Sequence, residues 1–227
     1  MKKLLLFDID GTLLRAKDAT RNAVTRAFRD VFDIEKSIED ISFLGQTDTV
    51  LFHEVAQVFT GHRLNEKEYS DIVDRYLEYL PGELERCRFW LMPGVETLLE
   101  NLSSREGIIL GLETGNIEPA AFLKLRRGSI GHYFSFGGFG SDNEDRTELV
   151  RIAIERARNL DSTITRDENI FLIGDSSHDI IAGRDRGINT IAVCTGYAEP
   201  ETLSAECPSF MLKDLSDLQH FLQCIGL

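Results

Sequence analysis

The sequence predicts an α/β protein with a Rossmann-like, doubly wound parallel sheet core and an inserted helical cap domain. An apolar run at residues 4–7 is typical of a strand that is covered on both faces. Helical periodicity follows it as far as about residue 80. Beyond residue 88 strands alternate with helical stretches, as they do in βαβ units. The predicted boundaries are residues 1–15 and 89–227 for the core and residues 16–88 for the cap.

The cap is predicted to contain three helices. Apolar residues recur three and four positions apart in residues 23–31 and again in residues 50–59. A third helix is expected after Asn65, because Asn65 and Glu68 have the spacing of a capping box. The Pro-Gly pair at residues 81–82 is expected to end this helix, since both residues are unfavourable inside one.

The core is predicted to alternate between short apolar strands and amphipathic helices. In order, the predicted elements are a helix after Pro93 and Gly94, a strand at 108–112, a helix that begins near Pro119, a short strand near 133–137, a helix at 147–158, a strand at 170–173, a helix at 179–186, a strand at 190–193, a short strand at 209–212 and a last helix from Leu215.

Composition excludes several classes of protein. With 227 residues, 42% of them hydrophobic, the chain can bury a substantial core. The net charge of −13 gives no attraction for nucleic acid or anionic lipid. The four cysteines form no C-x-x-C pair, which predicts reduced thiols in a cytoplasmic protein and disfavours a zinc site. No apolar run is long enough to span a membrane, and the oligomeric state is not readable from the sequence.

Two carboxylates directly follow the first predicted strand. Asp8 and Asp10 lie two positions apart within the string Phe-Asp-Ile-Asp-Gly-Thr-Leu. Open α/β sheets bind ligands at the carboxyl ends of their strands, so both acids are expected at the ligand-binding edge. A solvated acidic turn is the plainer explanation of a lone Asp-x-Asp-Gly, but the full string is far more specific.

Thr114, Gly115 and Asn116 form a second polar group, after the strand predicted at 108–112. A hydroxyl and the backbone N–H groups of such a turn can surround an oxyanion, although Thr-Gly-Asn is also ordinary turn chemistry. Arg146 comes third, directly before a predicted helix, and taken alone it would be a surface charge.

Asp175 and Asp179 form the fourth group, in the loop that follows the strand predicted at 170–173. Asp179 favours the N-terminus of the next helix electrostatically, and Ser177 or His178 is expected to cap it. Helix capping alone leaves Asp175 unexplained.

Taken in order, the four groups resemble the four motifs of the haloacid dehalogenase superfamily of phosphotransferases, across essentially the whole chain. The insertion after the first motif is similar to the superfamily's helical caps, and residues 113–120 look like phosphoglycolate-phosphatase-like members. The third motif is usually Lys-Pro, whereas Arg146 precedes Thr147 here. Lys124 is the competing cation, and Arg146 is preferred because its helix leads to the strand that bears Asp175.

The resemblance implies a magnesium-dependent phosphatase that hydrolyses a small phosphate monoester through an aspartyl-phosphate intermediate. Asp8 would be the nucleophile, and Asp10 would protonate the leaving alkoxide and then activate water. Thr114 would donate to a phosphoryl oxygen, and Arg146 would neutralise charge there with a bidentate fork. Mg²⁺ would be held by Asp8, the backbone carbonyl of Asp10, Asp175 and, directly or through water, Asp179.

Residues 44–48 are the best candidate for a cap loop that contacts the substrate. Within this loop, Gly45, Gln46 and Thr47 are the predicted substrate-binding residues. A plain helix-helix turn with Thr47 as N-cap explains this segment equally well. A dehalogenase needs no acid to protonate halide, so Asp10 favours phosphate ester chemistry. A phosphomutase on a sugar phosphate and a non-catalytic phospho-ligand binding protein remain as alternatives, and the natural substrate is not readable.

Overall fold

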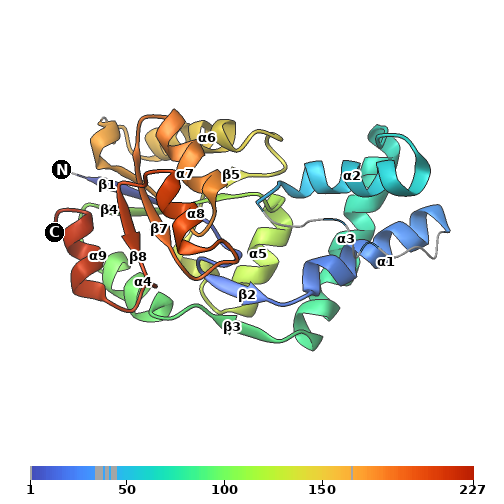
Figure 1. The fold of residues 1–227 in the computed structure, drawn as a ribbon, viewed down its shortest axis with the longest axis horizontal. Coiled ribbons are helices and arrows are strands. Elements are labelled where there is room, and N and C mark those ends of the chain that lie inside the picture. The colour runs from blue at the N-terminus through green and yellow to red at the C-terminus, as the bar shows by residue number, and fades with distance from the viewer. Residues whose placement is uncertain (1, 34–37, 39–40, 42–44, 165) are drawn as a thin grey trace.

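The computed structural model describes residues 2–33, 38, 41, 45–164 and 166–227 (Figure 1). The predicted fold class is confirmed, because six strands form one sheet in which every neighbouring pair runs parallel. Across the sheet the order is β5 (Gly137–Phe139), β4 (Ile108–Thr114), β1 (Lys3–Phe7), β6 (Ile170–Gly174), β7 (Asn189–Val193) and β8 (Phe210–Leu212).

Side chains of the central strand β1 alternate between two apolar cores, one on each face of the sheet. Leu5 and Phe7 belong to one core, and Leu4 and Leu6 belong to the other. A strand covered on both faces needs apolar residues at every position, which explains the continuous run at residues 4–7. The first core includes residues of α4 (Val95–Ser103), α5 (Glu118–Arg127) and α9 (Leu218–Cys224), and the second includes residues of α6 (Arg146–Leu160) and α7 (Ser177–Asp185).

The inserted segment forms a helical unit with an apolar cluster of its own, beside the core (Figure 1). Phe28, Phe52 and Tyr76 lie at the centre of this cluster. Ile117 and Ala120 of the core also belong to it, so the unit packs on the N-terminal end of α5. Among the described residues of the unit, the helices are α1 (Ala19–Phe32), α2 (Asp48–Thr60) and α3 (Glu66–Arg86).

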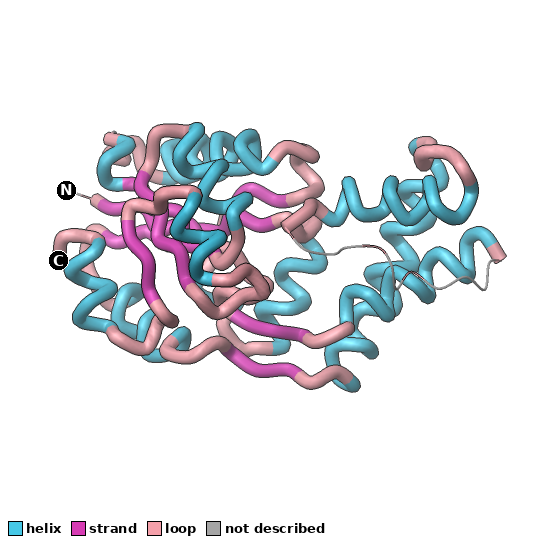
Figure 2. The backbone as a smooth tube through the Cα atoms, in the orientation of Figure 1, coloured by secondary structure: helices cyan, strands magenta, loops and turns pink. Residues whose placement is uncertain are grey.

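Two short antiparallel strands, β2 (Leu14–Ala16) and β3 (Phe89–Leu91), carry the chain into and out of the helical unit (Figure 2). Both are missing from the sequence prediction, as is the short helix α8 (Pro200–Ala205). The boundaries predicted between core and cap fall at this two-stranded connection. Within the described part of the chain, every helix is too short or too polar to cross a lipid bilayer.

The predicted start of the third cap helix is confirmed. Asn65 Oδ1 accepts from the Glu68 N–H at 3.0 Å, and Glu68 Oε2 accepts from the Asn65 N–H at 2.9 Å. The predicted end is wrong, because α3 continues through the Pro-Gly pair to residue 86. Leu80 and Leu84 are buried on either side of that pair, so tertiary packing offsets a local cost of about 3 kcal/mol for proline.

The strand expected near 133–137 is also displaced. A 3₁₀ turn, η1 (Gly131–Tyr133), lies there, and β5 begins only at residue 137. Phe134 and Phe136 are buried in the two cores, and apolar burial alone does not distinguish a turn from a strand. The last helix begins three residues later than predicted, because the Asp217 side chain accepts from the His220 N–H at 3.0 Å and caps the helix there. A second 3₁₀ turn, η2 (Asp167–Asn169), precedes β6.

Candidate active site

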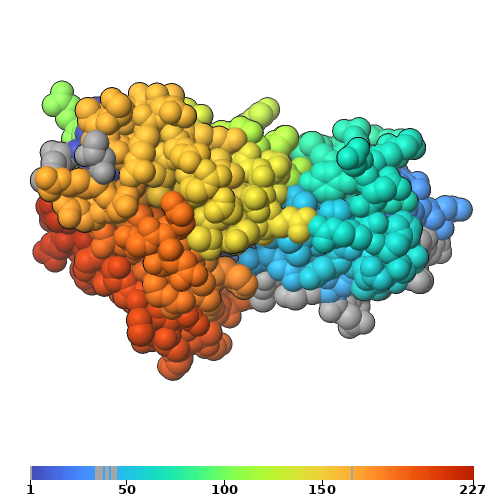
Figure 3. Space-filling view, turned by 90° about the horizontal axis from the view of Figure 1, so that it is seen from above, coloured from blue at the N-terminus to red at the C-terminus, as the bar shows by residue number. Residues whose placement is uncertain are grey.

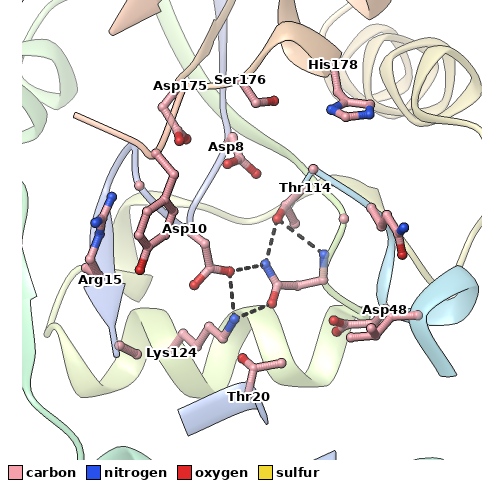
Figure 4. A pocket seen from close by; sticks show the side chains of 18 of the residues that line it. Asp8, Asp10, Arg15, Thr20, Asp48, Thr114, Lys124, Asp175, Ser176 and His178 are labelled. Carbon is pink, nitrogen blue, oxygen red and sulfur yellow. Dashed lines mark hydrogen bonds and ion pairs between the residues drawn. The ribbon is translucent and has the colours of Figure 1, made fainter. Parts of the chain in front are cut away.

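Most of the predicted site residues line one cavity of about 720 Å³, at the carboxyl edge of the sheet (Figure 4). Asp8 follows β1, Thr114 ends β4 and Asp175 follows β6, and these strands are neighbours. Parallel neighbours bring their carboxyl ends together, which explains why residues far apart in the sequence meet here. The other predicted lining residues are Asp10, Gly45, Gln46, Gly115, Asn116 and Arg146. Thr47 and Asp179 do not line the cavity, and Leu44 lies outside the described residues.

Asp8, Asp175 and Asp179 form a buried acidic cluster that suits a divalent cation. One carboxylate oxygen of each lies within 4.8 Å of the other two. Burial, followed by the charge of Asp179, raises the pKa of Asp8 well above its ordinary range. The same two causes raise the pKa of Asp175 to about 7. A cation would relieve this repulsion, and an all-oxygen donor set is the one that Mg²⁺ prefers.

Asp179 acts on the site through its neighbours. Its Oδ2 accepts from the Ser176 N–H at 2.9 Å and from the Ser176 hydroxyl at 2.6 Å, and its Oδ1 pairs with Arg146. Ser176 is therefore the N-cap of α7, and the prediction of Ser177 or His178 is wrong. Asp179 is therefore held in place by Ser176 and Arg146 while one of its oxygens lies within 4.8 Å of oxygens of Asp8 and Asp175.

Asp175 is held from two sides. The Thr12 hydroxyl donates to Asp175 Oδ1 at 2.9 Å. Gly11 has φ +99°, and a Cβ at this position would overlap the Asp175 carboxylate. A side chain larger than hydrogen would therefore displace the Asp175 carboxylate, which explains why the first motif has glycine at this position.

Arg146 lies beside the predicted nucleophile, with its Nη2 3.7 Å from Asp8 Oδ1. Its fork is directed elsewhere than predicted, because Nε and Nη2 donate to Glu113 Oε1 and Oε2 at 3.2 and 2.7 Å. Burial opposes the charge of Arg146, but Glu113 and Asp179 raise its pKa above the ordinary value. Burial raises the pKa of Glu113 to about 7, although Arg146 lowers it. Sequence reasoning missed Glu113, whose signal is a glutamate in an otherwise apolar strand.

The competing cation, Lys124, lies in the same cavity but has different partners (Figure 4). Its Nζ is 2.6 Å from Asp10 Oδ2 and 2.6 Å from Asn116 Oδ1. Arg146 therefore reaches the predicted nucleophile, and Lys124 reaches the predicted acid-base residue. A signal for this was present in the sequence, since Lys124 shares the buried face of α5 with Ala121 and Leu125.

Thr114 and Asn116 are joined to each other. Thr114 Oγ1 accepts from the Asn116 N–H at 3.3 Å and from Asn116 Nδ2 at 2.8 Å. Since its oxygen is the acceptor in both contacts, the Thr114 hydroxyl hydrogen remains able to donate to an anion in the cavity.

The helical unit meets the core through the first turn of α2. The Asp48 carboxylate accepts from the Ile117 N–H at 2.9 Å, and burial raises the pKa of Asp48 to about 6. The predicted N-cap of α2 is confirmed, because Thr47 Oγ1 accepts from the Val50 N–H at 3.3 Å. Thr47 is buried at 1% exposure and does not line the cavity, which differs from its predicted place beside the substrate. Figure 3 shows the blue and cyan helical unit packed directly against the yellow part of the core.

Known proteins resemble this chain over most of its length. The family profile of the haloacid dehalogenase-like hydrolases matches residues 5–193. The chain is similar to pyrophosphatase PpaX of Bacillus velezensis, at 25% identity over 222 residues that cover 95% of this chain and 94% of PpaX. PpaX of Anoxybacillus flavithermus is also 25% identical, over 221 residues that cover 96% of this chain and 95% of that protein.

Two solved structures share the fold over nearly their whole length. CbbY from Rhodobacter sphaeroides, in complex with phosphate, superposes with a TM-score of 0.76 at 19% identity and 96% coverage of both chains. A predicted phosphoglycolate phosphatase from Haemophilus somnus superposes with a TM-score of 0.73 at 22% identity and 98% coverage of both chains.

Proposed function

Because the chain belongs to the haloacid dehalogenase-like hydrolase family, we propose that it hydrolyses a small phosphate monoester with the help of Mg²⁺. One observation carries this proposal. Asp8, Asp10, Asp175, Thr114 and Arg146 line the same cavity, although they come from separate parts of the chain.

Asp8 is the proposed nucleophile. One of its carboxylate oxygens attacks phosphorus, the bond from phosphorus to the ester oxygen breaks, and an aspartyl-phosphate remains on Asp8. Arg146, 3.7 Å from Asp8 Oδ1, offsets the negative charge of the transferring group. The Thr114 hydroxyl and the backbone N–H groups of the following turn are placed to donate to its oxygens.

Asp10 is the proposed general acid and base. It donates a proton to the departing alkoxide, and its carboxylate then takes a proton from the water that attacks the aspartyl-phosphate. That second step releases inorganic phosphate and returns Asp8 to its starting state. The Asp10 side chain is 44% exposed at the cavity, so both the leaving group and water can reach it.

The acidic cluster fits Mg²⁺, which would supply positive charge to the phosphoryl oxygens when bound. Asp8, Asp175 and the backbone carbonyl of Asp10 would hold it, and Asp179 would orient one of its waters. Without a cation, the buried carboxylates would repel both one another and an anionic substrate.

The helical unit, residues 16–88, is proposed to act as a cap that excludes water and selects the substrate. Gly45 and Gln46 line the cavity from the cap, and Gly115 and Asn116 line it from the core. The first compounds to test are phosphoglycolate and pyrophosphate. The sequence resembles phosphoglycolate-phosphatase-like proteins, and the name of the PpaX relatives implies pyrophosphate as their substrate. The cytoplasmic location predicted from the spacing of the four cysteines stays part of this proposal.

The test is phosphate release by the purified protein from a panel of phosphate esters and pyrophosphate, with and without Mg²⁺. We expect turnover of at least one monoester by the wild type and none above background by Asp8→Asn. Transfer of the phosphoryl group to a sugar phosphate without net release would identify a phosphomutase. Tight phosphate binding without turnover would identify a phospho-ligand binding protein, and either result would overturn the proposal.

A further inference from the structure

Lys124 is a buried cation for which the phosphatase mechanism above gives no role. Its side chain is 2% exposed, and it rises from α5 into the floor of the cavity (Figure 4). An ammonium group is costly to bury unless it is paired and hydrogen-bonded. Here it has both kinds of partner, the carboxylate of Asp10 and the amide oxygen of Asn116, each at 2.6 Å.

Two donors converge on one oxygen of Asp10. Lys124 Nζ and Asn116 Nδ2 lie 2.6 and 2.8 Å from Asp10 Oδ2. Two bonds to the same oxygen fix the rotation of the carboxyl group. Oδ1 takes part in neither bond and belongs to a side chain that is 44% exposed.

Lys124 also fixes the orientation of the Asn116 amide. A lysine ammonium can only donate, so the amide oxygen of Asn116 must face Lys124 and the amide NH₂ must face Asp10. The same NH₂ group donates to Thr114 Oγ1 at 2.8 Å. One buried lysine therefore orders both the acid-base carboxylate and the hydroxyl that is proposed to bind phosphate.

We propose that Lys124, together with Asn116, positions the carboxyl group of Asp10. The two residues hold Asp10 Oδ2, so that Asp10 Oδ1 is the atom that exchanges protons. This inference rests on the proposed phosphatase function. The proton moves from Asp10 Oδ1 to the oxygen of the departing alkoxide, and later from water to Asp10 Oδ1. Lys124 itself gives up no proton, and Arg146 keeps its separate place beside Asp8.

The cap contributes a second carboxylate to the surroundings of Lys124. The positive charge of Lys124 partly lowers the pKa of Asp48, which burial raises to about 6. Asp48 belongs to α2, and its carboxylate binds the Ile117 N–H at the start of α5. Lys124 thus lies close to both Asp10 of the core and Asp48 of the cap, so its removal takes away a positive charge that acts on two carboxylates.

The experiment measures how the rate of enzyme phosphorylation depends on the leaving group, in single turnovers with a series of phosphate esters. Lys124→Met keeps the length of the side chain and removes its charge. We expect a rate loss of about 10- to 100-fold for esters with poor leaving groups, little loss for an activated aryl phosphate and a nearly unchanged KM. In an Asp10→Asn background, Lys124→Met should cause little further loss, because the two residues act on one step.

The matched control is Lys67→Met, at a lysine on α3 whose side chain is 88% exposed. It should behave as the wild type with every ester. If thermal melts show that Lys124→Met does not fold, Asn116→Ser removes the second donor to Asp10 and should give the same leaving-group dependence in weaker form.

Equal rate losses for all leaving groups, or a full further loss in the Asp10→Asn background, would show that Lys124 does not act through Asp10. Failure of the proposed function has a different signature, since the wild type would then release no phosphate from any ester. The two results are therefore distinguishable.

Discussion

The backbone N–H of Asp48 donates to the carbonyl oxygen of Gly115 at 2.7 Å, so the first residue of α2 is joined directly to the turn that follows β4. A Cβ at Gly115 would lie 3.1 Å from the Thr47 Cα and would overlap the carbonyl oxygen of Gln46. The turn proposed to hold the phosphoryl group is therefore also the surface on which the cap packs, and no side chain fits between them.

Gly115→Ala is expected to lower turnover by about 10-fold or more, because the added methyl group forces apart two backbone segments that line the cavity. The measurement is steady-state turnover together with a thermal melt. Gly131→Ala is the matched control, since the nearest heavy atom to its added Cβ lies at 3.6 Å. Equal activity of the two variants would mean that the contact between cap and core is not needed for catalysis.

Arg146→Ala is expected to abolish most turnover and to destabilise the fold. It leaves Asp8, Glu113 and Asp179 without their shared cation, and removing one partner of a buried ion pair costs about 3–5 kcal/mol. Arg146→Lys should keep intermediate activity, because lysine supplies the charge but not the two bonds to Glu113. Turnover and urea unfolding would check both. Normal turnover of Arg146→Ala would remove this residue from the mechanism.

Mg²⁺ should stabilise the protein as well as activate it. Binding to the folded state alone raises the melting temperature, and the effect depends on the carboxylates that hold the ion. We expect Mg²⁺ to raise the melting temperature of the wild type and to raise that of Asp175→Asn much less. Ca²⁺ should bind but inhibit turnover, because its irregular coordination shell would misplace the attacking Asp8 oxygen. Full turnover after exhaustive chelation would contradict the metal role.

Asp48 should make the stability depend on pH. Its pKa rises from 3.8 to about 6 on folding, chiefly through burial, so the folded state holds this proton more tightly than the unfolded state does. The free energy of unfolding therefore falls as the pH rises from about 4 to about 6, by up to about 3 kcal/mol from this group. Asp48→Asn removes that loss and keeps a side-chain oxygen for the Ile117 N–H.

The measurement for Asp48 is the difference in unfolding free energy between Asp48→Asn and the wild type, from urea titrations between pH 4 and pH 8. It should grow in favour of the variant up to about pH 6 and then stay constant. A difference that does not change with pH would contradict the prediction that the pKa of Asp48 is higher in the folded state than in the unfolded state.

The sequence by itself determined the sheet, the inserted helices and the position of the site. These follow from short-range patterns, such as the apolar run at residues 4–7, the helical periodicities and acids placed directly after strands. Parallel strands then bring their carboxyl ends together whatever their separation in the chain, so Asp8, Thr114 and Asp175 could be assigned to one site before the fold was known.

Only the tertiary structure decided which charges pair and where elements end. Lys124 binds Asp10 although 114 positions separate them, and Arg146 binds Glu113 across 33 positions. The sequence around a lysine or arginine does not predict its partner, because the packing of helices on the sheet determines which carboxylate comes close. The continuation of α3 through Pro81 has the same cause, since burial of Leu80 and Leu84 outweighs the local preference of proline and glycine to end a helix.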